Sequence, residues 1–140
     1  TAKLSEMGVE FAEEINSLTV DARNKICGVS VRTMPYPGFP TDMQSQLTAL
    51  LCTCEGTSSV TETVFENRFA HAEELIKTGA DIYIDADKAI IDGNPELADL
   101  NRDAPRTLIA KDLRGGAGLL IAGLKAKGET RVFGTRYVDR

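Results

Sequence analysis

This 140-residue sequence repeats itself after about 70 residues, which restricts the fold more than any other feature of the chain. The strongest match is an apolar stripe at helical spacing that directly follows an aspartate in each half, Asp42 and Asp112. Both stripes place apolar residues at offsets 0, 4, 7, 8 and 11, and a strand pattern follows each of them. The sequence therefore predicts two copies of one unit, residues 1–70 and residues 71–140, within a single domain.

Each unit opens with a short helical pattern that a glycine ends, Gly8 in the first copy and Gly79 in the second. Residues 9–21 and residues 80–92 then read as two strands around a polar turn, which is typical of a β-hairpin. A third strand, the helix after the aspartate and a fourth strand complete the unit. This order favours an α+β (mixed α/β) fold of two layers, with helices packed on one face of one mostly antiparallel sheet.

The two copies differ in one place, because residues 34–40 are inserted before Asp42 and have no counterpart in the second copy. The insert contains three prolines and a glycine, which exclude a helix and remove the donors that a sheet ladder needs. We therefore expect a stiff, extended loop that leads directly into a helix at Asp42. Asp42 then has two interpretations, a helix cap that accepts backbone N–H groups or a functional carboxylate.

Charge and composition exclude several partners. The 16 basic and 21 acidic residues give a net charge of −5, so the chain predicts no nucleic-acid partner. No apolar run reaches the ~20 residues of a membrane span, which predicts no membrane partner. Cys27, Cys52 and Cys54 have neither metal-ligand spacing nor an even count, and we expect small buried hydrophobes. His71, the single histidine, is expected to be a solvated residue in the first turn of a helix.

Four motifs resemble those of the UDP-N-acetylglucosamine 1-carboxyvinyltransferases, which are enolpyruvyl transferases. They are P-Y-P-G-F-P-T-D-M-Q (residues 35–44), T-E-T-V-F-E-N-R-F (61–69), K-D-L-R-G-G-A (111–117) and Y-V-D-R (137–140). The resemblance covers the whole chain and implies an inside-out α/β barrel of three βαβαββ-type repeats, of which two are present here. Because the chain starts without Met inside a helical pattern, we expect a C-terminal-side fragment whose partner is the missing N-terminal part of the same enzyme.

The activity that this resemblance implies is transfer of the enolpyruvyl group from phosphoenolpyruvate to the 3′-hydroxyl of UDP-N-acetylglucosamine. This is the first committed step of peptidoglycan synthesis in the bacterial cytoplasm, and it implies no metal or prosthetic cofactor. Such a reaction needs a base for the hydroxyl, an acid for the alkene carbon, and cations for the phosphate and carboxylate. Asp42 matches the family's general base. The family's acid, a cysteine on a mobile loop, has no counterpart here, so the chain alone is predicted to be inactive.

Other positions of the family's site carry over through the same motifs. Val64 and Phe65 match residues that line the uridine-sugar site, although a Val-Phe pair at a strand end is also typical of a core. Arg140 matches the arginine that grips the phosphoenolpyruvate moiety, and a guanidinium can pair with carboxylate or phosphate at two points.

Three further residues match positions in the family's cleft, and each has a structural alternative. Arg68 occupies the place of Arg140 in the first repeat and is alternatively an arginine paired with a nearby carboxylate. Asp112 and Arg114 match a cleft Asp-Leu-Arg, or else act as a helix cap and a surface charge. Two glycines follow Arg114 where the family usually has Ala-Ser, and they could expose backbone N–H groups to an anion.

Two other classes of function remain open from the sequence. The chain could be a stand-alone module that binds nucleotide sugars without catalysis, or a structural protein in which the repeat only builds a scaffold. The scaffold interpretation predicts that Asp42→Asn changes only helix capping, and it leaves the proline insert unexplained. Because two units leave room for a third, we also expect self-association through the exposed barrel edge.

Overall fold

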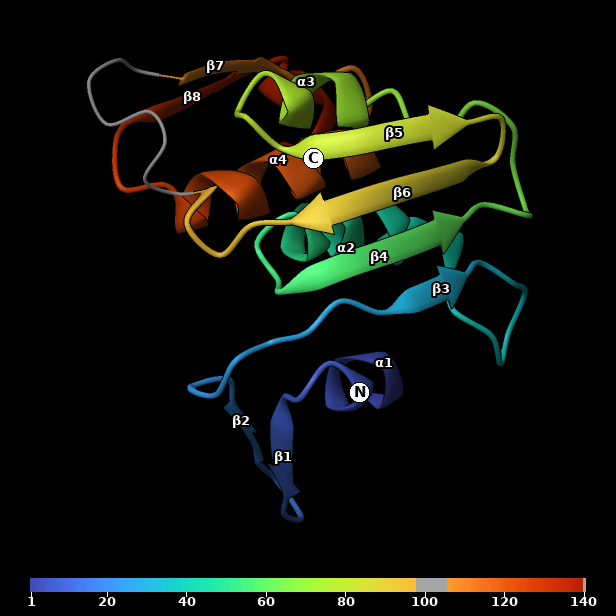
Figure 1. The fold of residues 1–140 in the computed structure, drawn as a ribbon, viewed down its shortest axis with the longest axis vertical. Coiled ribbons are helices and arrows are strands. Elements are labelled where there is room, and N and C mark those ends of the chain that lie inside the picture. Colours follow the sequence, from blue (N-terminus) through green and yellow to red (C-terminus); the bar gives the residue numbers. More distant parts are fainter. Residues whose placement is uncertain (98–105, 140) are drawn as a thin grey trace.

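The computed structural model describes residues 1–97 and 106–139, and both halves show the expected order of elements (Figure 1). The first copy consists of α1 (Ala2–Glu6), β1 (Glu10–Glu13), β2 (Leu18–Asp21), β3 (Ser30–Arg32), the 3-10 helix η1 (Thr41–Met43), α2 (Gln44–Leu51) and β4 (Gly56–Thr61). The second copy consists of α3 (Ala72–Ile76), β5 (Asp81–Asp85), β6 (Lys88–Gly93), β7 (Arg106–Ile109), α4 (Leu113–Lys125), β8 (Thr130–Phe133) and the 3-10 helix η3 (Thr135–Tyr137).

The strands form three sheets within the described residues, where the sequence had suggested one. The central sheet has the order β3-β4-β6-β5, with β3 parallel to β4 and the other pairs antiparallel. The pairs β1–β2 and β7–β8 form separate two-stranded sheets. Strand β4 of the first copy pairs with β6 of the second, Gly56 opposite Gly93 and Thr61 opposite Lys88. The repeats are therefore joined by a backbone ladder as well as by side chains.

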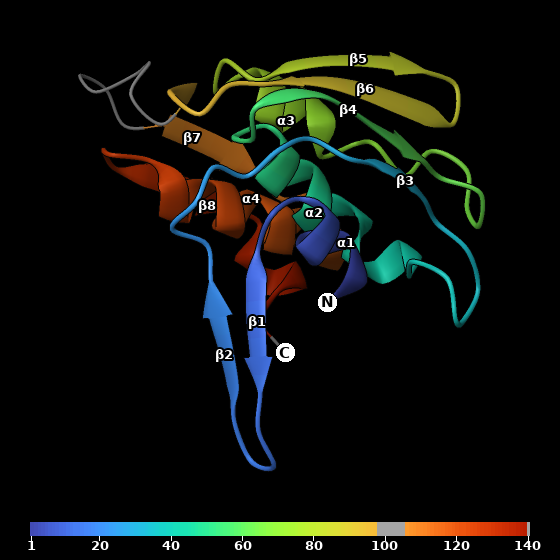
Figure 2. The same cartoon turned by 60° about the horizontal axis from the view of Figure 1, so that its bottom comes forward.

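Helices α2, α3 and α4 lie on one face of the central sheet, as Figure 2 shows with the sheet above them. Helix α2 packs against η1 and β4 of its own copy and against β6 and α4 of the second copy. This arrangement places one continuous core between the layers. Its most deeply buried side chains are those of Met7, Leu51, Val60, Leu75, Ile91, Leu108 and Leu119.

The apolar stripe is part of the core in α2 but not in α4. Leu47, Leu51 and Cys54 are buried as expected for the first copy and Leu50 is half-buried, whereas Met43 at the start of the stripe is 49% exposed. In the second copy Ala117 is half-buried, and the other four expected core positions are exposed, with Leu124 the extreme case at 87%. Helix α4 instead buries a glycine-rich face against α2, because a Cβ on Gly118 would approach a carbonyl oxygen of α2 to 2.8 Å. The apolar stripe of α2 is buried in part by α4 and β6 of the second copy, and no corresponding elements bury the stripe of α4 within the described residues.

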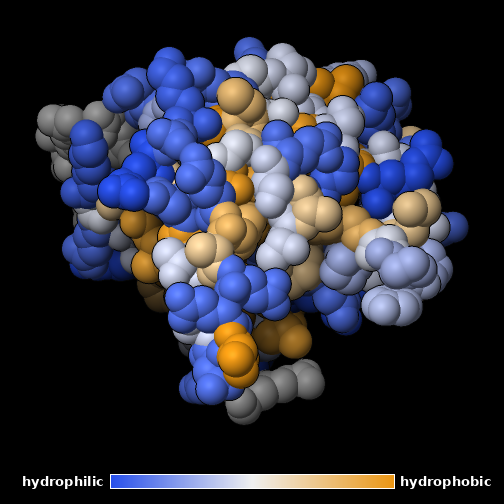
Figure 3. Space-filling model, turned by 90° about the horizontal axis from the view of Figure 1, so that it is seen from below, coloured by the Kyte–Doolittle hydropathy of each residue, from blue (hydrophilic) through white to orange (hydrophobic). Residues whose placement is uncertain are grey.

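The β1–β2 hairpin projects away from the helices and also exposes apolar side chains (Figure 2). Ile15 is 99% exposed, and Leu18 and Val20 are each about half exposed. On the face shown in Figure 3, hydrophobic side chains lie among hydrophilic ones and reach the protruding lower end. Both ends of the two-copy array therefore carry apolar surface.

The structure corrects the expectation for His71, which is 4% exposed and not solvated. Its ring lies near that of Phe69, with centroids 6.2 Å apart, and the start of α4 covers it. A Cβ on Gly115 would come within 3.3 Å of the His71 Cβ, so glycine at this position permits the close approach of α3 and α4. Cys52 and Cys54 are buried as expected, whereas Cys27 is exposed. None of the helices in the described ranges is long and apolar enough to cross a membrane.

Candidate functional site

The proline insert is a compact loop that folds back and hydrogen bonds to itself, and not the extended loop that the sequence suggested. The Met34 N–H donates to the Phe39 carbonyl at 2.9 Å, and the Gly38 N–H donates to the Pro35 carbonyl at the same distance. Proline has no backbone N–H, so the carbonyl groups of this loop depend on the N–H groups of its other residues for hydrogen bonds. The loop is therefore an ordered support that ends at η1, where Asp42 lies.

The two repeated aspartates have different local roles. Asp112 is the N-cap of α4, and its Oδ1 accepts a hydrogen bond from the Gly115 N–H at 2.9 Å. Asp42 lies inside η1, and neither η1 nor α2 has a side-chain cap. The helix-cap interpretation is thus right for Asp112 and wrong for Asp42. A carboxylate that caps nothing, at the end of a loop that only one copy has, needs another explanation.

Asp42 forms an ion pair with Arg114 of the second copy, whose Nε donates to its Oδ1. The Arg114 carbonyl also accepts a 2.6 Å hydrogen bond from the Ser45 hydroxyl, which fixes the first turn of α4 against the start of α2. The Asp42 side chain is still 64% exposed, and that of Arg114 is 38% exposed. Exposed pairs contribute at most about 1 kcal/mol, so stability is a weak reason for this arrangement.

Val64, Phe65 and Arg68 line a surface hollow of about 580 Å³ beside the β5–β6 turn. Phe65 is 51% exposed and Val64 36%, which excludes the core interpretation for this pair. The Arg68 guanidinium lies over the Phe65 ring, 4.3 Å from its centroid, and makes no ion pair within the described part of the chain. A cation stacked on a ring beside an open hollow can contact an anionic or aromatic ligand.

Sequence reasoning missed Glu62, whose carboxylate is buried although the residue is acidic. The residue is 2% exposed, and its oxygens accept hydrogen bonds from two threonines and from the N–H groups of Val64 and Phe65. Burial acts to raise the pKa of this carboxyl, but the four hydrogen bonds outweigh it and hold the pKa below its usual value. The available signal was the alternation of Ser58, Val60 and Glu62 toward the core side of one strand pattern.

The remaining residues that the sequence suggested for the site contact neither Asp42 nor the hollow within the described residues. The Gly115 and Gly116 N–H groups donate to the Asp112 side chain and carbonyl, so they are occupied and not turned toward an anion. Arg140 lies outside the described residues. No group of three or more His, Cys, Asp or Glu side chains that could hold a metal occurs in residues 1–97 and 106–139.

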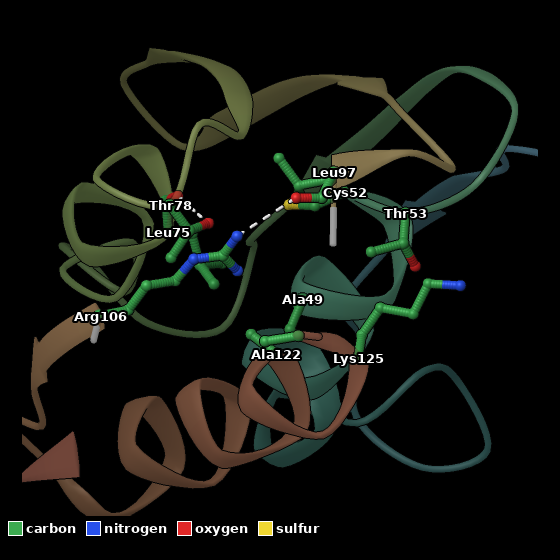
Figure 4. A pocket seen from close by; sticks show the side chains of 10 residues that line it. Ala49, Cys52, Thr53, Leu75, Thr78, Leu97, Arg106, Ala122 and Lys125 are labelled. Atoms are coloured by element: carbon green, nitrogen blue, oxygen red, sulfur yellow. Dashed lines mark hydrogen bonds between the residues drawn. The ribbon is translucent and has the colours of Figure 1, made fainter. Parts of the chain in front are cut away.

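A second cavity lies between α2, α3 and α4 and is too small for a substrate. Figure 4 shows Arg106 reaching into it toward Cys52 and Leu97, with its guanidinium donating to the Leu97 carbonyl at 3.4 Å. The enclosed volume is about 20 Å³, which is room for about one water molecule. The open hollow beside Phe65 is therefore the better candidate for ligand binding.

Comparison with known proteins gives consistent matches along the chain. The family model described as EPSP synthase (3-phosphoshikimate 1-carboxyvinyltransferase) matches residues 1–140. UDP-N-acetylglucosamine 1-carboxyvinyltransferase 1 of Clostridium acetobutylicum is 50% identical over 139 residues, which are 99% of this chain and 32% of that protein. The protein of that name from Desulfofundulus thermocisternus is 47% identical over 139 residues, 99% of this chain and 55% of that protein.

Solved structures agree on the fold. The enolpyruvyl transferase NikO from Streptomyces tendae superimposes with a TM-score of 0.84 at 28% identity, over 98% of this chain and 31% of that one. EPSP synthase from Acinetobacter baumannii gives a TM-score of 0.57 at 18% identity, over 91% of this chain and 30% of that one. The second likeness concerns the fold alone. The chain thus spans about a third of the length of the first relative and of both structures.

Proposed function

The chain belongs to the EPSP synthase family, and we propose that it forms part of a UDP-N-acetylglucosamine 1-carboxyvinyltransferase. In this proposal the whole enzyme transfers the enolpyruvyl group of phosphoenolpyruvate to the sugar 3′-hydroxyl, in the bacterial cytoplasm and for peptidoglycan synthesis. The identity of about 50% to relatives of that name supports this substrate pair. The two thirds of such an enzyme that this chain does not match would be its partner.

The observation that carries the proposal is the contrast between Asp42 and Asp112. The repeat gives both the same position, yet only Asp112 caps its helix, while Asp42 is exposed at the end of the proline loop. Arg114 engages Oδ1 of Asp42, and Oδ2 has no partner among the described residues. That oxygen can accept a hydrogen bond from a sugar hydroxyl, and the guanidinium holds the carboxylate in one orientation.

The reaction then assigns roles to this chain's residues as follows. Asp42 takes the proton of the 3′-hydroxyl while that oxygen bonds to C2 of phosphoenolpyruvate and C3 gains a proton from an acid. The tetrahedral ketal collapses when C3 loses a proton and the bond from C2 to the phosphate oxygen breaks. We propose that Val64 and Phe65 contact the uridine-sugar, and that Arg68, Arg114 and Arg140 bind the anionic groups, with Asp112 acting through the first turn of α4.

The same assignment predicts that this chain alone does not turn over. The Cys52 and Cys54 thiols are buried and donate to carbonyls of α2, and burial raises their pKa values to about 12 and about 11. Neither of these thiols can therefore supply the proton that C3 needs, and the exposed Cys27 is not among the residues that line the hollow. Phosphate release by the purified chain above the uncatalysed rate would contradict this proposal.

The experiment that tests the proposed function is a calorimetric titration with UDP-N-acetylglucosamine. We expect Asp42→Asn to weaken binding at least about tenfold, because a hydrogen bond to a charged acceptor is lost. Asp81→Asn removes the same charge from an exposed position of β5 and should leave the affinity unchanged. Equal affinity for the wild type and Asp42→Asn would contradict the role of Asp42. A binding module without catalysis would also bind the nucleotide sugar, whereas a scaffold would bind it in no variant.

We also propose that the isolated 140-residue chain associates with a second copy of itself. The described chain contains the β4–β6 pairing between its two repeats, and β8 and β2 are the corresponding strands at its two ends. A second copy can therefore supply the contact that each end lacks.

A further inference from the structure

The structure points to a residue that borders the candidate site and holds the other residues of that site in place. We propose that Glu62 is a positioning residue whose buried carboxylate fixes the proline loop, and with it Asp42, relative to Val64 and Phe65. The predicted effect on the affinity for UDP-N-acetylglucosamine rests on the proposed function. The structural part of the inference stands on contacts within this chain alone.

The first observation is that Glu62 holds both ends of the proline loop. Its Oε1 accepts from the hydroxyl of Thr33, which precedes the loop, at 2.7 Å. Its Oε2 accepts from the hydroxyl of Thr41, which follows the loop, at 2.8 Å. Because Thr41 directly precedes Asp42, the position of its side chain sets the direction in which the backbone enters η1. One carboxylate therefore closes the base of the loop.

The second observation is that the same carboxylate also holds the segment that lines the hollow. Oε1 of Glu62 accepts from the Val64 N–H at 2.9 Å and from the Phe65 N–H at 3.3 Å. These backbone bonds fix the point at which the chain leaves β4 and turns Val64 and Phe65 toward solvent. Asp42 and the hollow are therefore connected through the two oxygens of one side chain.

The third observation is that the cluster is buried and fully used. Thr33 is 0% exposed and Glu62 is 2% exposed. The Thr33 hydroxyl oxygen accepts from the Thr63 N–H at 2.9 Å while its hydrogen goes to Glu62. A buried carboxylate with four donors is costly to disturb, because a donor that loses this acceptor is left without a partner inside the protein. Such a cluster holds one geometry, which is what a positioning role requires.

The chain offers a test that leaves Glu62 in place. Thr41→Val removes only the hydroxyl that ties Oε2 to the end of the loop, and Thr41→Ser keeps that hydroxyl. Thr53→Val is the matched control, because the Thr53 hydroxyl is also partly buried and makes a 2.9 Å bond, to the Leu50 carbonyl. Both valine variants lose one hydroxyl of similar burial, but only one of them is bonded to Glu62.

The first measurement is amide hydrogen exchange by NMR, which needs no ligand. In Thr41→Val we expect the Met34 and Met43 amides to exchange about tenfold faster, as for the loss of one charge-assisted hydrogen bond. The Val64 and Phe65 amides should shift in the spectrum because their shared acceptor relaxes. Thr41→Ser and Thr53→Val should both retain the wild-type exchange of the loop. Unchanged loop exchange in Thr41→Val would overturn the inference.

The second measurement is the affinity for UDP-N-acetylglucosamine. Thr41→Val should weaken this affinity about fivefold to tenfold in the wild-type background. In a chain that already carries Asp42→Asn, the same substitution should weaken the affinity by less than about twofold, because the loop acts on binding through Asp42. Equal weakening in both backgrounds would overturn the positioning role even if the exchange result holds. Absence of binding in every variant would contradict the proposed function instead, and the exchange measurement would then still decide whether Glu62 fixes the loop.

Discussion

At the scale of single residues, His71 is the group whose protonation the fold opposes most clearly. Its side chain donates to the Arg68 carbonyl, while its Nε2 is buried without a hydrogen-bond partner. Burial lowers the pKa of His71 from its usual 6.5 to about 4, although the nearby carboxylate of Asp112 and that hydrogen bond act in the opposite direction. The imidazole is therefore neutral in the folded protein under conditions in which the unfolded chain would bind a proton.

We expect this difference to make the protein less stable in mild acid. Because the pKa in the folded state is depressed, the unfolded state binds more protons as the pH falls from 6.5 toward 4. The free energy of unfolding should drop by about 2 kcal/mol between pH 7 and pH 5, measured by urea denaturation. His71→Gln keeps a donor and cannot titrate, so its stability should be nearly the same at both pH values. A wild-type drop that persists in this variant would assign the effect to other groups.

Sequence reasoning at this scale can name residues that belong to a motif, but it misses residues that are defined by their surroundings. Asp42 and Arg114 were expected in one cleft through the motifs, and the structure brings them into contact. Glu62 was not identified, and His71 was expected in solvent, because burial depends on what other elements cover. The alternation of β4 and the glycines of α4 were visible in the sequence, but only the packed structure shows which side chains they enclose.

At the scale of elements, the sequence predicts the order of helices and strands but not the strand pairing between the two repeats. The order of helices and strands follows from local periodicity and turn residues, and the structure confirms it. The division into three sheets depends on β4 of one copy pairing with β6 of the other, which no local pattern encodes. The same is true of α4, whose glycine face packs on α2 only once the two copies are joined.

The two repeated aspartates give a matched test at this scale. Asp112→Ala removes a cap and should lower the free energy of unfolding by about 1 kcal/mol, because the Gly115 N–H loses its acceptor. Asp42→Ala removes an exposed ion pair and no cap, so its effect on stability should be smaller. Urea denaturation of the two variants side by side measures the difference. Equal destabilisation would mean that Asp42 also has a structural role.

At the scale of the whole molecule, each end of the two-copy array displays one half of the contact seen at its centre. Val60 of β4 faces Ala89 of β6 in that contact, and Ile91 lies on the same buried side of β6. The repeat makes Leu18 and Val20 of β2 the counterparts of Ala89 and Ile91, and both are about half exposed. Strand β8 is the counterpart of β4 and pairs only with β7 among the described strands.

A head-to-tail contact between β8 of one copy and β2 of another would therefore repeat the central antiparallel ladder, and it explains why self-association is expected. Sedimentation velocity of the 140-residue chain should show a mass that rises as the loading concentration increases a hundredfold.

Val20→Lys should keep the chain monomeric, because it places a charge at the position that would be buried. Thr19→Lys is the matched control on the opposite face of β2, where the counterpart Ile90 remains 37% exposed, and it should still associate. A concentration-independent monomer mass for the wild type would contradict the proposal. Association that Val20→Lys does not weaken would show that the chains meet through another surface, for which the exposed stripe of α4 is the next candidate.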